Sequence, residues 1–146
     1  MPDLYSTDLS DSSTVYLNHL MKGKYVFIDF WGSWCGPCIA TLPKLKEFYQ
    51  KVKDRDDVLV MGIALEHKKD VDKLRKIIRE NEVEWMNVWN NFSTRKSLGA
   101  VHGKLRIDTF PTYMIIDKEG KIVYKDKSIF KAQEAVELFM KLIVGG

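Results

Sequence analysis

The two cysteines of the chain, Cys35 and Cys38, lie three positions apart and enclose a Gly-Pro pair. They follow a short apolar run and precede an amphipathic repeat, which places them where a buried strand leads into a helix. Unpaired backbone N–H groups and the helix dipole at such a junction stabilise a thiolate more than a thiol. We therefore expect a Cys35 pKa below the usual value of about 8.5 and a nucleophilic thiolate at neutral pH. Cys38 lies one helical turn further on, within reach of Cys35 for a disulfide.

Two further residues have chemical meaning beside this pair. Asp29 interrupts the apolar run six residues before Cys35. Burial without a partner would raise the pKa of its carboxyl group, which suits a proton acceptor. Pro111 lies between the bulky Phe110 and a strand-like run, a position typical of a cis peptide bond. A trans-proline in a plain turn is the alternative interpretation of Pro111.

The hydrophobic pattern predicts the elements that must position these residues. Runs rich in β-branched and aromatic residues predict strands over 24–31, 58–65, 85–89, 112–116 and 121–125. Apolar residues spaced by three and four predict helices over 37–53, 71–81 and the C-terminal residues, with a short helix capped at Ser93 or Thr94 and ending at Gly99. Pro43 should kink the first helix. The order predicts an α/β fold with a central mixed β-sheet flanked by helices on both faces.

Length and composition favour one soluble domain. With 146 residues, 45% of them hydrophobic, the chain is long enough for one core. Residues 1–13 are polar, and we expect a flexible leader there, followed by a single domain over 14–146. The formal charge of +3 contains no basic block, so no nucleic-acid partner is expected. No apolar run approaches the ~18 residues of a membrane span, and the first residues lack the basic-then-apolar order of a secretory signal.

The segment Trp34-Cys35-Gly36-Pro37-Cys38 resembles the active-site motif of the thioredoxin superfamily. The resemblance runs from about residue 24 to residue 143, and the positions that match in register outside the motif are Asp29, Pro43 and Phe110-Pro111-Thr112. Segment 66–82 and the strand that begins at Thr112 are similar to the TlpA/ResA-type thiol-disulfide oxidoreductases. The resemblance implies a thioredoxin-like fold and an enzyme that reduces protein disulfides by dithiol-disulfide exchange without a cofactor.

The resemblance also implies a role for each site residue. Cys35 would attack a substrate disulfide, and Cys38 would resolve the mixed disulfide. Asp29 would help to deprotonate Cys38 through water, although the TlpA/ResA type commonly has Asn at this place. The residues that would bind an extended substrate segment are Trp34, Gly36, Pro37, Phe110 and Pro111.

Glu66 has two interpretations. It ends the second predicted strand, at a place where some TlpA/ResA-type proteins keep an acidic residue beside their cysteines. The other interpretation is a solvated residue that leads into a charged helix, and the sequence does not decide between the two.

Partners and compartment also follow from the resemblance. The substrates would be proteins that contain disulfides, and an upstream thiol donor, membrane-borne for an extracytoplasmic protein, would reduce the pair again. The resemblance favours the periplasm or another extracytoplasmic compartment, with the cytoplasm left open. We expect a monomer.

Other functions of a C-x-x-C pair fit less well. A zinc site needs four ligands, and beyond its cysteines the chain offers only His19, His67 and His102, none spaced as a ligand pair, so no metal is expected. A peroxidase of this superfamily would have Thr-x-x-Cys, a copper chaperone would have C-x-x-x-C with a His, and neither pattern is present. A non-catalytic binding module that keeps the pair for stability stays open.

Overall fold

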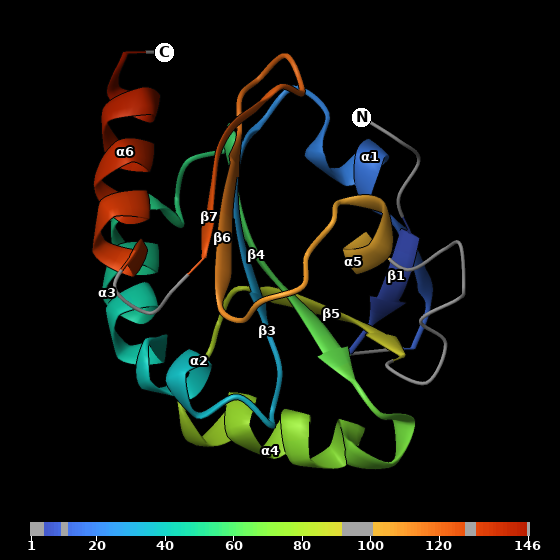
Figure 1. The fold of residues 1–146 in the computed structure, drawn as a ribbon. Coiled ribbons are helices and arrows are strands. Elements are labelled where there is room, and N and C mark those ends of the chain that lie inside the picture. The colour runs from blue at the N-terminus through green and yellow to red at the C-terminus, as the bar shows by residue number, and fades with distance from the viewer. Residues whose placement is uncertain (1–4, 10–11, 92–100, 128–130, 146) are drawn as a thin grey trace.

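The structure is a computed structural model of the chain, and it describes residues 5–9, 12–91, 101–127 and 131–145. Its strands form one mixed sheet in the order β2-β1-β5-β4-β3-β6-β7 (Figure 1). The strands are β1 (Tyr5–Asp8), β2 (Thr14–Tyr16), β3 (Tyr25–Trp31), β4 (Val58–Glu66), β5 (Met86–Asn91), β6 (Thr112–Ile116) and β7 (Ile122–Lys127). The helices are α1 (Leu17–Met21), α2 (Gly36–Ala40), α3 (Leu42–Val52), α4 (Val71–Glu80), α5 (Val101–Lys104) and α6 (Ala132–Val144), with a 3-10 turn η1 (Lys68–Asp70).

Strand β3 lies inside the sheet and leads directly to the cysteine motif. It runs parallel to β4 and antiparallel to β6, so that Asp29 lies opposite Gly62 on one side and Tyr113 on the other. β5 continues the parallel part, while β1 and β7 pair antiparallel with β5 and β6. Every residue of β3 is buried, as expected for a strand with both faces covered. The mixed sheet predicted from the sequence is confirmed.

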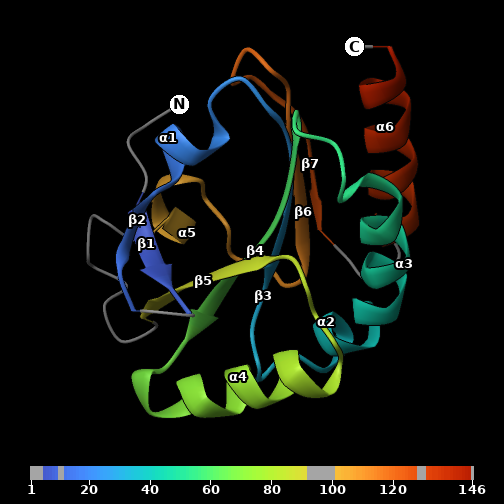
Figure 2. The same cartoon turned by 180° about the vertical axis from the view of Figure 1, so that it is seen from behind.

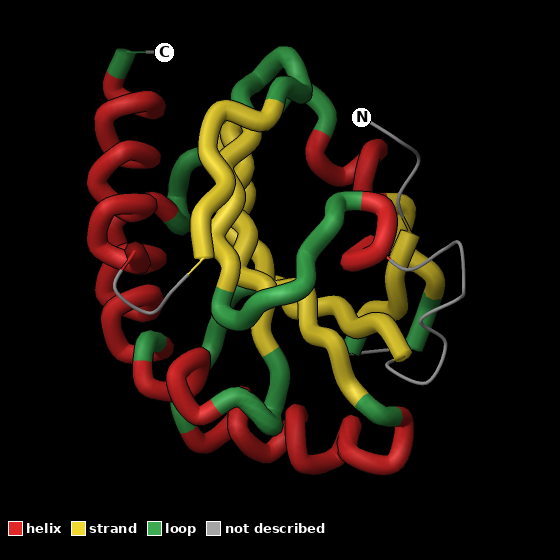
Figure 3. The backbone as a smooth tube through the Cα atoms, viewed as in Figure 1, coloured by secondary structure: helices red, strands yellow, loops and turns green. Residues whose placement is uncertain are grey.

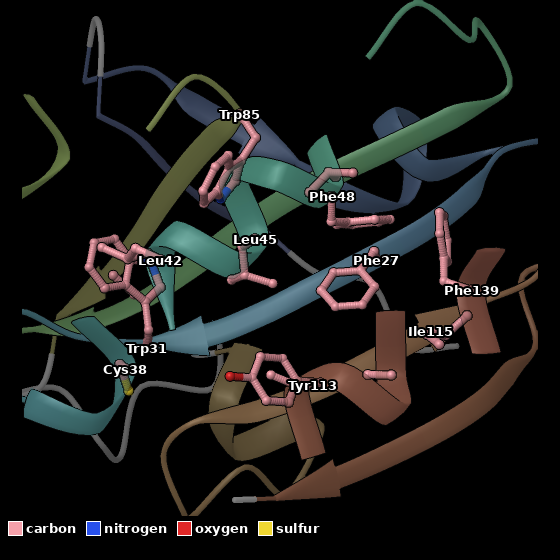
Figure 4. Packing of buried hydrophobic residues seen from close by; sticks show 14 of the residues in the cluster. Phe27, Trp31, Cys38, Leu42, Leu45, Phe48, Trp85, Tyr113, Ile115 and Phe139 are labelled. Carbon is pink, nitrogen blue, oxygen red and sulfur yellow. The ribbon is translucent and has the colours of Figure 1, made fainter. Parts of the chain in front are cut away.

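Helices cover both faces of this sheet, which the view from behind in Figure 2 also shows. In Figure 3 the yellow strands lie between two groups of red helices, and α4 crosses the end of the sheet where β3 leads into α2. A first hydrophobic core lies between the sheet and the helices α3 and α6. In it the rings of Phe27 from β3 and Phe139 from α6 pack with their centroids 5.7 Å apart (Figure 4). Phe30 belongs to a second core under α1 and α5. Because side chains alternate along a strand, Asp29 shares the face of Phe27 and Trp31.

The helix predicted over 37–53 is divided into two. α2 ends at Ala40 and α3 begins at Leu42, with Thr41 between them. Pro43 explains the break, because it has no N–H to donate to the Ile39 carbonyl and its ring clashes with that carbonyl. The sequence analysis identified the correct residue, Pro43, but it expected a kink where the structure has a complete break in the helix.

The expected flexible leader contains a strand. Residues 5–8 form β1, with Thr7 opposite both Thr14 of β2 and Trp89 of β5. The Ser6 hydroxyl donates to the Trp89 carbonyl at 2.8 Å. The polar sequence of this segment has no strand pattern of its own, so its conformation comes from pairing with the edge of β5. The short helix expected from Ser93 or Thr94 to Gly99 lies outside the described residues.

The expected hairpin near the C-terminus is confirmed. β6 and β7 pair antiparallel, and between them the Gly120 N–H donates to the Asp117 carbonyl at 3.0 Å. Gly120 has a φ of 83°, a left-handed conformation that glycine adopts without strain. At the other end of the hairpin, Thr112, which directly follows Pro111, pairs with Lys127 at the end of β7.

Candidate active site

The two cysteines lie at the start of α2, one near the surface and one beneath it. They form a disulfide with a Cα–Cα distance of 5.3 Å. Cys35 is the N-cap residue of α2, and its Sγ accepts a hydrogen bond from the Cys38 N–H at 3.2 Å. Cys35 is 5% exposed, between the exposed Trp34 and Gly36, whereas Cys38 is fully buried. Only Cys35 is therefore placed for attack by or on a second protein.

Two aromatic side chains, Trp34 and Phe110, form a rim next to Cys35. The Trp34 side chain is 45% exposed, and its indole N–H donates to the Leu65 carbonyl at 2.7 Å. Its ring packs edge-on against Phe110, with centroids 5.1 Å apart. The Phe110–Pro111 peptide bond is cis, as the sequence predicts. Two segments far apart in the chain thus form one surface beside the disulfide.

His102 supports this rim from behind. Its buried ring packs against Phe30 at 5.6 Å and against Phe110 at 5.8 Å between centroids. Burial lowers the His102 pKa to about 4, so the ring is neutral at physiological pH. The sequence offered His102 only as one of three scattered candidates for a zinc ligand, and in the structure its ring lies against Phe30 and Phe110.

Glu66 is buried directly beside the cysteine loop. One carboxylate oxygen accepts a hydrogen bond from the Ser33 N–H at 2.8 Å, and the other accepts from the Ser33 hydroxyl at 2.6 Å. Burial raises the Glu66 pKa, and the two bonds from Ser33 act in the opposite direction. The side chain is not exposed at all, so the interpretation as a solvated residue is wrong. Glu66 holds the loop that carries Trp34 and Cys35.

Loss of this carboxylate should destabilise the protein. We expect Glu66→Ala to lower the free energy of unfolding by about 1–3 kcal/mol, because it leaves two buried donors of Ser33 without an acceptor. Glu66→Gln should lose less, since its amide can still pair with both groups. Urea unfolding measures both effects. The exposed Glu47→Ala on α3 is the matched control, expected to stay within about 0.5 kcal/mol of wild type, and an equal loss from the Glu66 and Glu47 variants would refute the role of Glu66.

Asp29 is a buried carboxyl group on the Cys38 face of β3. It is 1% exposed, and neither oxygen has a hydrogen-bond partner among the described residues. Burial raises its pKa to about 8, the direction expected from the sequence. Asp29 is therefore mostly protonated at neutral pH and can lose or accept a proton close to physiological pH.

A hydrogen-bonded chain runs from the neighbour of Asp29 to Cys38. Tyr113, directly opposite Asp29 on β6, donates to the Thr41 hydroxyl at 3.2 Å, and Thr41 donates to the Cys38 carbonyl at 2.8 Å. Burial raises the Tyr113 pKa, and the charge of Asp29 adds to that shift. Figure 4 shows the Tyr113 hydroxyl on the side of the ring nearest Cys38. Sequence reasoning missed Tyr113, because only the sheet register brings it to this place. It also missed Thr41, although a hydroxyl three residues after Cys38 in a helical segment is a local signal for a bond to the Cys38 carbonyl.

Trp31 forms the floor of the site. Its indole N–H donates to the Asn87 side-chain oxygen at 2.9 Å, and both residues are buried. A Cβ atom at position 62 would overlap that oxygen, so Gly62 makes the Trp31–Asn87 bond possible. Trp31 and Cys38 belong to the same buried core. Nothing in the local sequence of Asn87 or Gly62 indicated this contact.

Comparison with known proteins places this geometry in a family. A profile of the thioredoxin-like family matches residues 23–122, a range that includes both cysteines, Asp29, Glu66 and the cis Phe110–Pro111 bond. The chain belongs to the thioredoxin-like family. The thioredoxin-like fold predicted from the sequence is confirmed.

The thioredoxin-like chain is also similar to individual relatives. Thiol-disulfide oxidoreductase ResA of Bacillus thuringiensis (strain Al Hakam) is 34% identical over 127 residues, which cover 84% of this chain and 64% of ResA. The chain thus spans just under two thirds of that relative. The thioredoxin domain of a thiol-disulfide oxidoreductase from Bacteroides vulgatus has a TM-score of 0.78 at 28% identity, covering 96% of this chain and 92% of that domain.

A third similarity concerns the fold alone. The structure of a protein described as a DsbE-type thiol:disulfide interchange protein from Chlorobium tepidum has a TM-score of 0.76 at 23% identity, and the match covers 99% of this chain and 92% of that one.

Within the ranges that the structure describes, no helix is both long and apolar enough to cross a membrane.

Proposed function

We propose that this protein is a thiol-disulfide oxidoreductase that reduces disulfides in protein substrates. The observation that carries the proposal is the Cys35–Cys38 disulfide at the start of α2, with one sulfur near the surface and the other buried. The names of the relatives above support the same activity. The geometry suits dithiol-disulfide exchange, which needs no cofactor.

The exchange proceeds in two steps. In the reduced protein, the Cys35 thiolate attacks one sulfur of the substrate disulfide, forms a mixed disulfide, and releases the second substrate sulfur, which takes up a proton. Cys38 then loses its proton, and its thiolate attacks the Cys35 sulfur. The Cys35–Cys38 disulfide forms, and the substrate leaves as a dithiol. Two electrons pass from the protein to the substrate, and the two substrate sulfurs take up two protons: one balances the proton that Cys38 gives up, and the other comes from solvent because Cys35 reacts as a thiolate.

Asp29 acts in the second step as the proton acceptor for Cys38, through water. Its pKa of about 8 and its position on the Cys38 face of β3 support this role. The Tyr113–Thr41 chain ties the Cys38 carbonyl to β6 beside this carboxyl group. Glu66 contributes by accepting two hydrogen bonds from Ser33, which hold in place the loop that carries the nucleophile Cys35.

The substrate lies as an extended segment across the rim. Its backbone pairs beside Pro111, as an added strand would, and its side chains contact Trp34, Gly36, Pro37 and Phe110. The exposure of Trp34, Gly36 and Pro37 supports this placement.

The protein works as a monomer outside the cytoplasm, for example in the periplasm. The resemblance to the TlpA/ResA type supports this location. A dithiol donor, membrane-borne in such a compartment, restores the reduced pair by the reverse exchange, in which the donor becomes the disulfide.

The reduction potential of the pair tests the proposal. We expect a single two-electron transition at about −270 mV when Trp fluorescence is followed in a series of buffers with increasing thiol-to-disulfide ratio. Trp34 directly precedes Cys35, so its emission should report the redox state. The Cys35→Ser/Cys38→Ser double variant should show no transition. A wild-type protein without a transition would refute the redox function, and a potential about 100 mV higher would reverse the proposed direction.

A further inference from the structure

A charged pocket lies next to the cis Phe110–Pro111 bond, on the α5 side of the sheet. It has a volume of about 240 Å³ and is lined by Arg106, Asp108, Thr112, Lys125, Asp126 and Lys127. Thr112 directly follows Pro111 and pairs with Lys127 across β6 and β7. The pocket therefore borders the proposed substrate-binding rim, although none of the roles above uses its charged residues.

Arg106 reaches this pocket from an unusual backbone position. Its φ is 57°, in the left-handed region. It follows α5, where the Ile107 N–H donates to the His102 carbonyl at 2.8 Å and closes the end of the helix. Glycine is the usual residue at such a helix end, because other residues are strained there. Position 106 therefore carries an arginine although its backbone conformation favours glycine.

Two of the other charges in the pocket already have partners. The Lys125 ammonium donates to the Leu105 carbonyl at 3.0 Å, which fixes the loop after α5. Asp126 lies 3.8 Å from the Lys131 ammonium and accepts from the Lys127 N–H at 2.8 Å. The Lys125 bond ties the loop after α5 to β7, the two segments that line the pocket.

The remaining charge in the pocket is positive. Within the described ranges, no ion pair engages the side chain of Arg106 or Lys127. The lining has two acids, Asp126 and Asp108, and Asp108 accepts a hydrogen bond from the Thr109 hydroxyl at 3.1 Å. Against them stand the three cations Arg106, Lys125 and Lys127, so the lining has a net charge of +1. An anionic group entering here would meet a guanidinium, an ammonium and the Thr112 edge of the substrate site.

We propose that this pocket binds a carboxylate side chain of the substrate, so that the protein prefers disulfides with an Asp or Glu near the attacked cysteine. The proposal rests on the proposed function and deepens it. Arg106 and Lys127 supply the charge, and Lys125 holds the loop that positions Arg106. Because a strand residue spans about 3.3 Å, the acidic residue lies within a few positions of the substrate cysteine.

Matched peptide substrates test the proposal. Disulfide-bonded peptides carry Asp, Ala or Lys at one of three positions on either side of the cysteine, and kcat/KM is measured with the reduced wild-type protein. At the best position we expect Asp to exceed Lys by about fivefold, mainly through KM, and the difference to shrink in high salt. Equal rates for Asp and Lys at every position would overturn the proposal.

Variants at position 106 locate the effect. Arg106→Gly suits the left-handed backbone, so the protein should fold at least as stably as wild type while its preference for Asp falls to about that of an uncharged site. Arg106→Lys should retain part of the preference. Lys141→Ala, on the exposed side of α6, removes the same charge elsewhere. An equal loss of preference in Arg106→Gly and Lys141→Ala would overturn the proposal, because the preference would then reflect net charge.

The two proposals fail in different ways. If no peptide is reduced by wild type, the proposed function is wrong. If all peptides are reduced at the same rate, the exchange activity stands and only the carboxylate pocket is refuted.

Discussion

Cys38→Ser protein, once reduced, should accumulate as a disulfide-linked complex with its substrate, whereas Cys35→Ser protein should form none. Cys35 alone is near the surface, so it makes the first attack, while the buried Cys38 is needed to release the mixed disulfide. Turnover should fall to the background rate in both variants. Non-reducing gel electrophoresis with a disulfide-containing protein detects the complex.

The design separates the proposed order of attack from its alternatives. Complexes trapped by Cys35→Ser instead would reverse the roles of the two sulfurs. Normal turnover by Cys38→Ser would refute the two-cysteine mechanism. A double variant that binds its partner and functions normally would favour the non-catalytic binding module.

Asp29→Asn should slow release of the mixed disulfide by about 10- to 100-fold while leaving the first attack nearly unchanged. In wild type the release rate should rise with pH through about 8, the pKa of Asp29, because only the ionised carboxylate accepts the proton. The variant should lack this rise. Stopped-flow measurement of attack and release across pH tests it, and an unchanged pH profile of release would remove Asp29 from the mechanism.

The same substitution should stabilise the fold at high pH. The Asp29 pKa is 3.8 in its ordinary state and about 8 in the folded protein, so the folded state binds one more proton between these values. The free energy of unfolding of wild type is therefore not reduced by Asp29 below about pH 4, and it decreases as the pH rises from there toward 8. Asn does not ionise, so the variant should match wild type at pH 4 and exceed it by several kcal/mol above pH 8.

Denaturant unfolding of the oxidised protein across this pH range gives the comparison. The exposed Asp54→Asn should show no such trend. A stability difference for Asp29→Asn that is the same at low and high pH would mean that the Asp29 carboxyl is not buried as described.

The sequence alone sufficed where a property depends on neighbours along the chain. Cys35 and Cys38 follow an apolar run that is short, rich in β-branched and aromatic residues and bounded by glycines, which favours a buried strand and places the pair at the start of the next helix. An acid inside that run must be desolvated, so the raised pKa of Asp29 was predictable from the sequence. Pro43 cannot donate a backbone hydrogen bond inside a helix, which predicted a disturbance of the helix at this residue, although the sequence analysis expected a kink and the structure has a break.

Tertiary structure decided what depends on register and on segments distant in the chain. Glu66 meets Ser33 only because β3 and β4 run parallel, with Trp31 opposite Ala64. Tyr113 comes to lie opposite Asp29 only through the antiparallel pairing of β6. A one-residue shift of either strand would turn these side chains to the other face.

Tertiary structure likewise determined the conformation of residues 5–8 and the composition of the charged pocket. The polar segment of β1 becomes a strand because the edge of β5 supplies its hydrogen-bond partners. Arg106 and Lys127 line one pocket because the fold brings the loop after α5 next to the end of β7, beside Thr112. Local sequence determined the reactive pair and its strand-to-helix frame, whereas pairing across the sheet determined which charges and hydroxyls surround it, since those contacts join residues that the chain itself holds far apart.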